Sequence, residues 1–141
     1  MIALPDNRTL AIWAGQGVGE DASSIGTVLA RVIETDGTLG DIIEIQDDLS
    51  YRPTPYATLL EDGSIALTWL DPGQIGINDL PLLSGRISAD GQFLSGPTVI
   101  SNTVSFNFPP RIAALTDGGY VVVFEDQSET NRVEFQRFDA N

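Results

Sequence analysis

The side chains of this chain that could do chemistry are almost all carboxylates. The sequence contains 20 Asp and Glu residues and seven Arg, and it has no His, Cys or Lys. Without His there is no general base that titrates near neutral pH, and without Cys there is no thiol nucleophile. Without Lys, Schiff-base chemistry and the Gly-x-x-x-x-Gly-Lys phosphate loop are excluded. The chemistry that remains is binding of a hard cation by oxygen ligands, or hydrolysis by a pair of carboxylates.

Six of these carboxylates lie in or beside loops at corresponding places of an internal repeat. We therefore expect them at one rim of the fold. Oxygen ligands in loops suit Ca²⁺, which takes about six to eight of them. The candidate calcium ligands are Glu20, Asp21, Asp71, Asp79, Glu125 and Asp126. The spacing of an EF-hand is absent, and the alternative interpretation is solvated charge that keeps the protein soluble.

Three aromatic residues lie in connecting segments and do not recur at matching places in the repeat. They are Tyr51, Phe106 and Phe108. Exposed aromatic rings can stack on a sugar ring, so these three are candidate ligand contacts. The alternative is that they fill gaps between neighbouring repeats.

No residue of this chain is predicted to be catalytic. A pair of carboxylates could hydrolyse glycosides, but 20 acidic residues make a chance pair almost certain. The glycines at positions 15, 17 and 19 lack the Gly-x-Gly-x-x-Gly register and a surrounding βαβ pattern, so they predict a loop, not a dinucleotide site. We expect no cofactor, or Ca²⁺ alone.

The elements that would position these side chains come from the internal repeat. Residues 4–13, 60–69 and 115–124 share one pattern, which ends in Trp13, Trp69 and Phe124 at spacings of 56 and 55 residues. A fixed period of this size indicates a repeat architecture. We expect the three aromatic residues to pack between neighbouring repeats.

Each repeat predicts four short antiparallel strands. Asp-Gly pairs, at 36–37, 62–63, 90–91 and 117–118, supply tight turns, with Asp6-Asn7 in the first copy. The turns separate strands near 56–60, 65–69, 82–87 and 98–101 in the second copy, with matching segments in the others. An Arg recurs in the third strand as Arg31, Arg86 and Arg137, and we expect it to brace a strand edge or a carboxylate.

Four-stranded meanders of this kind are typical of the blades of a β-propeller. The sequence therefore predicts one all-β domain over 1–141, a propeller-like array of three four-stranded antiparallel blades, approximately 1–50, 51–106 and 107–141. The third blade is expected to be incomplete, because its fourth strand is missing. Three blades are too few for a closed ring, so we expect a homo-oligomer or further blades of a longer parent chain.

The charge of the chain excludes two classes of partner. A formal net charge of −13 would repel the phosphates of nucleic acids and anionic membrane surfaces. The longest apolar runs are too short for a membrane-spanning helix, so we expect no membrane insertion.

The segment 110–124, with its core Leu-Thr-Asp-Gly-Gly-Tyr-Val-Val-Val-Phe, resembles the repeats of large secreted bacterial hemolysin-type (RTX-like) proteins and adhesins. Residues 133–141 resemble the second half of that repeat. The resemblance implies an extracellular bacterial protein and calcium binding, although the glycine-rich nonapeptide of RTX rolls is absent.

The function expected from these features is a non-catalytic interaction or scaffold module that presents loops to a carbohydrate or protein partner. Two alternatives remain open. One is a fragment of a carbohydrate-active propeller enzyme whose remaining blades complete the site, and the other is a purely structural adhesin spacer.

Overall fold

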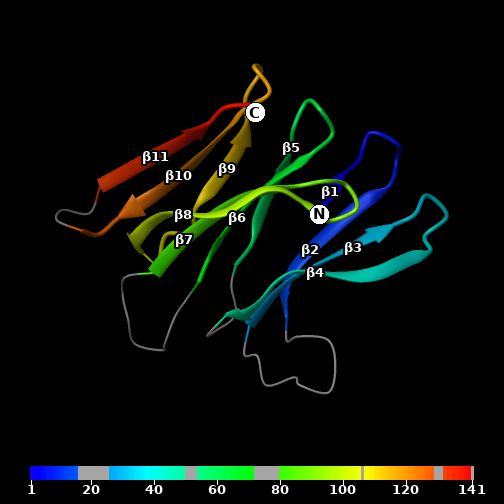
Figure 1. The fold of residues 1–141 in the computed structure, drawn as a ribbon, viewed down its shortest axis with the longest axis horizontal. Helices are drawn as coiled ribbons and strands as arrows, with labels where there is room; N and C mark the ends of the chain where they lie inside the picture. The colour runs from blue at the N-terminus through cyan, green and yellow to red at the C-terminus, as the bar shows by residue number, and fades with distance from the viewer. Residues whose placement is uncertain (16–25, 50–53, 72–79, 106, 129–131, 141) are drawn as a thin grey trace.

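The protein is all-β, and its strands form antiparallel sheets (Figure 1). The computed structural model describes residues 1–15, 26–49, 54–71, 80–105, 107–128 and 132–140. Within these ranges no residue is helical. It follows that the described part of the chain has no helix that is long and apolar enough to span a bilayer.

Eleven strands follow one another along the described residues. They are β1 (Ile2–Ala3), β2 (Thr9–Gly15), β3 (Gly26–Ile33), β4 (Leu39–Leu49), β5 (Tyr56–Leu59), β6 (Ile65–Leu70), β7 (Leu80–Ile87), β8 (Phe93–Val104), β9 (Arg111–Ala114), β10 (Tyr120–Asp126) and β11 (Arg132–Phe138). We call β1–β4 unit 1, β5–β8 unit 2 and β9–β11 unit 3, because each corresponds to one copy of the sequence repeat.

The strands pair into two sheets, not into the three separate sheets that the repeat predicts. Unit 1 forms a four-stranded sheet with its strands in chain order. Units 2 and 3 share a seven-stranded sheet, because the end of β8 pairs with the end of β10 through Val104 and Asp126. This larger sheet curls round until β5 lies beside β9, so that it forms a nearly closed, barrel-like surface.

Five tight turns share one backbone pattern, in 4–8, 34–38, 60–64, 88–92 and 115–119. The amide of the first residue donates to the carbonyl of the fifth at 2.8–2.9 Å, and the amide of the fourth donates to the first carbonyl at 3.0–3.2 Å. The fourth residue has a positive φ in every turn, which explains why it is Gly in four turns and Asn7 in the fifth.

The Asp at the third place of these turns is a turn former, as predicted, in four of the five. In each of these four turns its carboxylate accepts a hydrogen bond from the amide two residues later, at 2.8–3.2 Å. The four residues are Asp6, Asp36, Asp62 and Asp117. In the fifth turn the Ser88 hydroxyl accepts from the Gln92 amide instead.

Two apolar clusters form the core, and each lies between neighbouring units. The first joins units 1 and 2 around Trp69, which is fully buried with Leu10 and Ile65. The second joins units 2 and 3 around Phe124 and Tyr120. The prediction that Trp69 and Phe124 pack between repeats is therefore confirmed, whereas Trp13 is half-buried on the outer side of unit 1.

The expected equivalence of Arg31 with Arg86 and Arg137 is wrong. Arg86 pairs across strands with Ala66, and Arg137 pairs with Val121 at the same register. In unit 1 this register position is occupied by Val32, and Arg31 is one residue away, on the opposite face of the sheet. Arg31 therefore braces β4 locally, by donating from Nε to the Gly40 carbonyl at 2.5 Å.

Candidate functional site

The connections between strands divide into two kinds at the two ends of the sheets. Because successive strands run antiparallel, the five tight turns all lie at one end, which we call the turn end. The longer connections lie at the opposite end, which we call the loop end. They join β2 to β3, β4 to β5, β6 to β7, β8 to β9 and β10 to β11. The candidate ligand residues that the structure describes, Asp71, Phe108, Glu125 and Asp126, lie in or beside the loop end.

Five of the nine candidate residues lie outside the described residues: Glu20, Asp21, Asp79, Tyr51 and Phe106. The other four are Asp71, Phe108, Glu125 and Asp126. Among the residues that the structure describes, no group of three or more carboxylates is placed to hold a metal ion.

Asp126 is buried and joins units 2 and 3. One carboxylate oxygen accepts hydrogen bonds from the Thr103 hydroxyl at 2.8 Å and the Ser101 hydroxyl at 3.3 Å, and the other accepts from the Ser128 amide at 2.8 Å. The bonds from Ser128 first, and then those from Thr103 and Ser101, lower the pKa of Asp126 to about 2. The carboxylate thus holds the end of β10 against β8, and donors occupy both of its oxygens.

The remaining described candidates point in different directions. Glu125 precedes Asp126 on β10, so its side chain leaves the opposite face of the sheet. The amide of Asp71 donates to the carbonyl of Pro81 at 2.9 Å, which closes the end of the β6–β7 pair. Phe108 is 58% exposed, so its ring is accessible to a ligand, and its role as a ligand contact stays a prediction.

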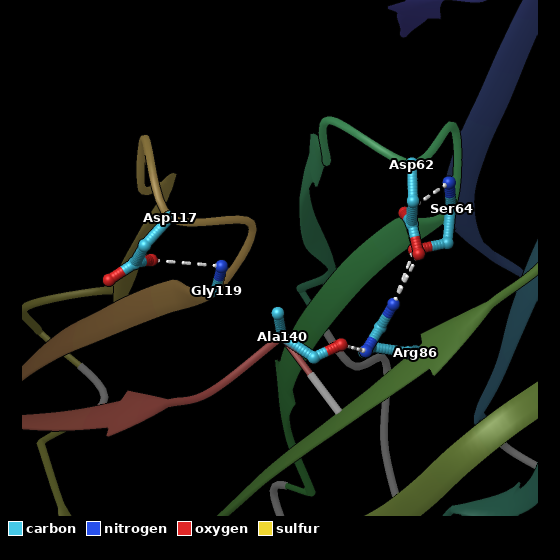
Figure 2. Close-up of polar contacts among 6 residues, drawn as sticks. All are labelled: Asp62, Ser64, Arg86, Asp117, Gly119 and Ala140. Atoms are coloured by element: carbon cyan, nitrogen blue, oxygen red, sulfur yellow. Dashed lines mark hydrogen bonds and ion pairs between the residues drawn. The ribbon is translucent and has the colours of Figure 1, made fainter.

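The most elaborate polar contact of the described residues is at the turn end, around Arg86 (Figure 2). One terminal nitrogen of Arg86 donates to the Asp62 carboxylate at 2.7 Å and to the Ser64 hydroxyl at 3.1 Å. The other donates to the carbonyl of Ala140 in unit 3 at 2.5 Å. Arg86 therefore ties the turn of its own unit to the chain that follows β11.

The carboxylate of Asp62 is held in its charged form by this arrangement. The hydroxyl of Ser64 donates to it at 2.6 Å and the Ser64 amide at 3.0 Å. These bonds, with a smaller contribution from the Arg86 charge, lower the pKa of Asp62. In unit 3, Arg137 makes the equivalent ion pair with Asp117.

Two shallow hollows flank Glu61 between the turns of units 2 and 3. One, of about 310 Å³, is lined by Glu61, Asp62, Gly118 and Ala140. The other, of about 380 Å³, is lined by Glu61, Ala114, Leu115 and Thr116. Arg86 is neutralised by Asp62 below the first hollow, so this surface carries exposed carboxylates and no free cation among its lining residues. The sequence signal for the Arg86–Asp62 contact was an Asp in the turn together with an Arg in the third strand. The strand register is needed to show that these two side chains meet.

Comparison with known proteins gives no match: no protein-family model, no curated protein and no solved structure matches this chain. The class of protein is therefore defined by its own geometry, an all-β protein of antiparallel units that pack face to face. Its turn end is braced by Asp–Arg pairs, and its loop end carries the candidate ligand residues.

Proposed function

We propose that this chain is a non-catalytic, propeller-like interaction or scaffold module of a secreted bacterial protein, which presents its loop end to a carbohydrate or protein partner. The observation that carries the proposal is a difference between the two ends: the polar side chains of the turn end hold the fold together, whereas the connections of the loop end vary between units. At the turn end, four turn Asp residues and two third-strand Arg residues are engaged in contacts that hold the fold. The connections of the loop end differ in length and composition between units, as is typical of binding loops on a rigid scaffold.

The packing of the units supports a propeller-like arrangement. The first strands of the units lie side by side, β1 beside β5 and β5 beside β9, and the remaining strands of units 1 and 3 lie on opposite sides of them (Figure 1). The guanidinium carbon of Arg111 on β9 lies 5.0 Å from the centre of the Tyr56 ring on β5. First strands gathered near one axis, with sheets stacked round it, are what a propeller requires.

A sugar is the ligand class that the exposed aromatic side chain at the loop end fits best. Phe108 offers an accessible ring face on which the apolar face of a sugar ring can stack. We expect the chain to bind members of a glycan array without releasing reducing sugar from them. Phe108→Ala should weaken the binding several-fold, whereas Phe93→Ala, near the turn end, should leave it unchanged.

The two alternatives predict different results in the same assay. Release of reducing sugar by the purified chain would overturn the non-catalytic proposal and favour the enzyme fragment. A blank glycan array, together with no binding in a panel of extracellular proteins, would favour the structural spacer.

Calcium stabilisation is part of the proposal and has its own test. Ca²⁺ held only by the folded state would raise the unfolding midpoint by several degrees relative to EDTA at constant ionic strength. Because Asp126 already accepts from three donors, we expect Glu125→Gln, and not Asp126→Asn, to reduce the shift. Equal midpoints in calcium and EDTA would contradict calcium binding and leave the interaction module without a metal.

A further inference from the structure

Units 1 and 3 each have one outer face that no other unit of the chain covers. The residues on these outer faces occupy the same strand positions as residues that are buried between neighbouring units. We call the surface of a unit that faces the following unit its tail face, and the surface that faces the preceding unit its head face. Residues paired directly across strands share a face, and neighbours along a strand lie on opposite faces. The register therefore assigns the residues of the second and third strands to one face or the other.

The middle of the tail face of unit 3 is apolar and exposed, and the charged side chains of Glu125 and Arg137 lie at its two ends. Leu82 and Ser84 lie on the tail face of unit 2, and both are buried at the boundary with unit 3. Their counterparts on β11 are Val133 and Phe135, which are 76% and 72% exposed. Val123, which pairs with Phe135, is also exposed. This surface thus has the positions and the apolar character of a unit boundary, but no following unit covers it in this structure.

The head face of unit 1 is the matching surface at the other end. The third residue of the repeated second-strand segment, counted from Thr9, Ile65 and Tyr120, lies on this face. It is fully buried in the other units, as Leu67 in unit 2 and Val122 in unit 3. In unit 1 this position is Ala11, which is only half-buried. Trp13, the counterpart of the fully buried Trp69, is half-buried as well.

On the head face of unit 1, Leu29 beside Trp13 is 4% exposed, so this face is less open than the tail face of unit 3. Side-chain sizes at one position nevertheless fit the two faces to each other. At both internal boundaries a small residue on the tail face belongs with a large residue on the head face: Ala30 with Ile65 in one core cluster, and Ser84 with Tyr120 at 3.1 Å between their hydroxyls. At the exposed faces the order is reversed, because the tail position is Phe135 and the head position is Thr9. A large tail residue facing a small head residue fills the same space.

A polar contact of the internal boundary also has equivalent residues on the two outer faces. Arg86, on the tail face of unit 2, donates to the carbonyl of Ala140, two residues after the third strand of unit 3. In unit 2 the residue two positions after the third strand, Ala89, packs against the cluster shared with unit 1. The corresponding residues of the exposed faces are Arg137 and Thr35. Arg137 is more than half exposed and lies on the tail face, two residues along β11 from Phe135.

We propose that the tail face of unit 3 binds the head face of unit 1 in a second copy of this chain, so that two chains close a ring of six units. The proposal rests on the propeller-like arrangement put forward above, because only units stacked round a common axis close in this way. A head-to-tail contact closes into a ring when its rotation allows, and closed propellers have about four to eight blades.

Sedimentation velocity at 0.15 M salt tests the proposal on the intact chain. The native protein is expected at twice the 15.1 kDa mass of one chain. Phe135→Glu should give the single-chain mass, since it places a charge in the apolar contact while its exposed position leaves the fold of one chain intact. Phe108→Glu changes the same residue type and the same charge outside both faces, and it should keep the two-chain mass.

A head-face variant distinguishes this geometry from pairing of two tail faces. Ala11→Glu places a carboxylate beside its cross-strand partner Arg31 and should also give single chains. A native mass of one chain, or an Ala11→Glu variant that keeps the two-chain mass, would overturn the proposal. Glycan binding measured on the same samples separates this failure from that of the proposed function, because a single chain that binds glycans contradicts only the ring.

Discussion

The two boundaries inside the chain occupy the same register positions but are built from different chemistry. At the boundary between units 1 and 2, the tail-face residue near the end of the third strand is Val32. It belongs to an apolar cluster with Leu10, Ile65 and Trp69. Between units 2 and 3 the same position is Arg86, which bonds to the Ala140 carbonyl. At the far end of this second boundary Asp126 joins β10 to β8.

The same position of the repeat can therefore stabilise a boundary in two ways, by apolar burial or by hydrogen bonds of a buried polar side chain. An apolar boundary depends on the area that it removes from water and is insensitive to pH. A boundary with buried polar groups depends on its hydrogen bonds, because each lost partner leaves a desolvated group. The following changes are therefore expected to act differently on the two boundaries.

The largest effect is expected at the apolar boundary. Trp69→Ala empties a fully buried site and should lower the free energy of unfolding by about 3–5 kcal/mol. Trp69→Phe should cost much less, because Phe124 occupies this position in unit 3 and the indole nitrogen of Trp69 has no hydrogen-bond partner among the described residues. Urea unfolding of both variants measures the two costs, and equal costs would contradict the packing role of the ring.

Replacing the buried arginine sharpens the comparison at the second boundary. Arg86→Met removes the bonds to Asp62, Ser64 and Ala140 and should cost about 1–3 kcal/mol. In single chains, such as the Phe135→Glu variant, Arg137→Met changes the counterpart residue in unit 3, whose pair with Asp117 is exposed, and should cost less than about 1 kcal/mol. If urea unfolding finds the two variants equally destabilised, the contact of Arg86 with unit 3 contributes nothing.

Acid should loosen the second boundary, with a smaller effect. The pKa of Asp126 is about 2 in the folded protein, below the value of about 4 expected when unfolded. Its stabilisation is therefore fully present above pH 4 and is lost as the pH falls towards 2, by about 2 kcal/mol. Asp126→Asn should remove this part of the pH dependence and leave that of the turn carboxylates.

Unfolding midpoints of the native chain and the Asn variant, compared between pH 5 and pH 2, measure this contribution. Parallel curves for the two proteins would show that the hydrogen bonds of Asp126 do not stabilise its charged form.

The local parts of the fold could be predicted from the sequence, because their causes are local. Each Asp-Gly turn requires a positive φ and a carboxylate acceptor, and both can be recognised in a few residues. The strands that flank these turns follow from β-branched and aromatic residues. The fourth strands proved longer than expected, and β8 continues past Pro97, a residue that normally marks the end of a strand.

The long-range parts could not be predicted in the same way. The shift of Arg31 by one register position becomes clear from the pairing of β2 with β3. Its one sign in the sequence is the distance to the following turn, because Arg31 precedes Asp36 by five residues and Arg86 precedes Asp90 by four. The junction of β8 with β10 depends on one residue pair, Val104 with Asp126. For the site, the sequence marked Asp126 as a candidate ligand, and the hydroxyl donors that surround it come from a different unit.

Cross-linking between copies tests most directly whether the exposed faces repeat the internal boundaries. The chain has no cysteine, so Arg137→Cys in one sample and Thr35→Cys in another introduce single thiols, which a bismaleimide with a spacer about as long as an Arg side chain should join when the samples are mixed. A Val32→Cys/Ala89→Cys variant provides the matching pair at an internal boundary. Head-to-tail stacking predicts a covalent pair of one chain of each kind. Linked pairs of Arg137→Cys chains alone, or no linked chains, would contradict it.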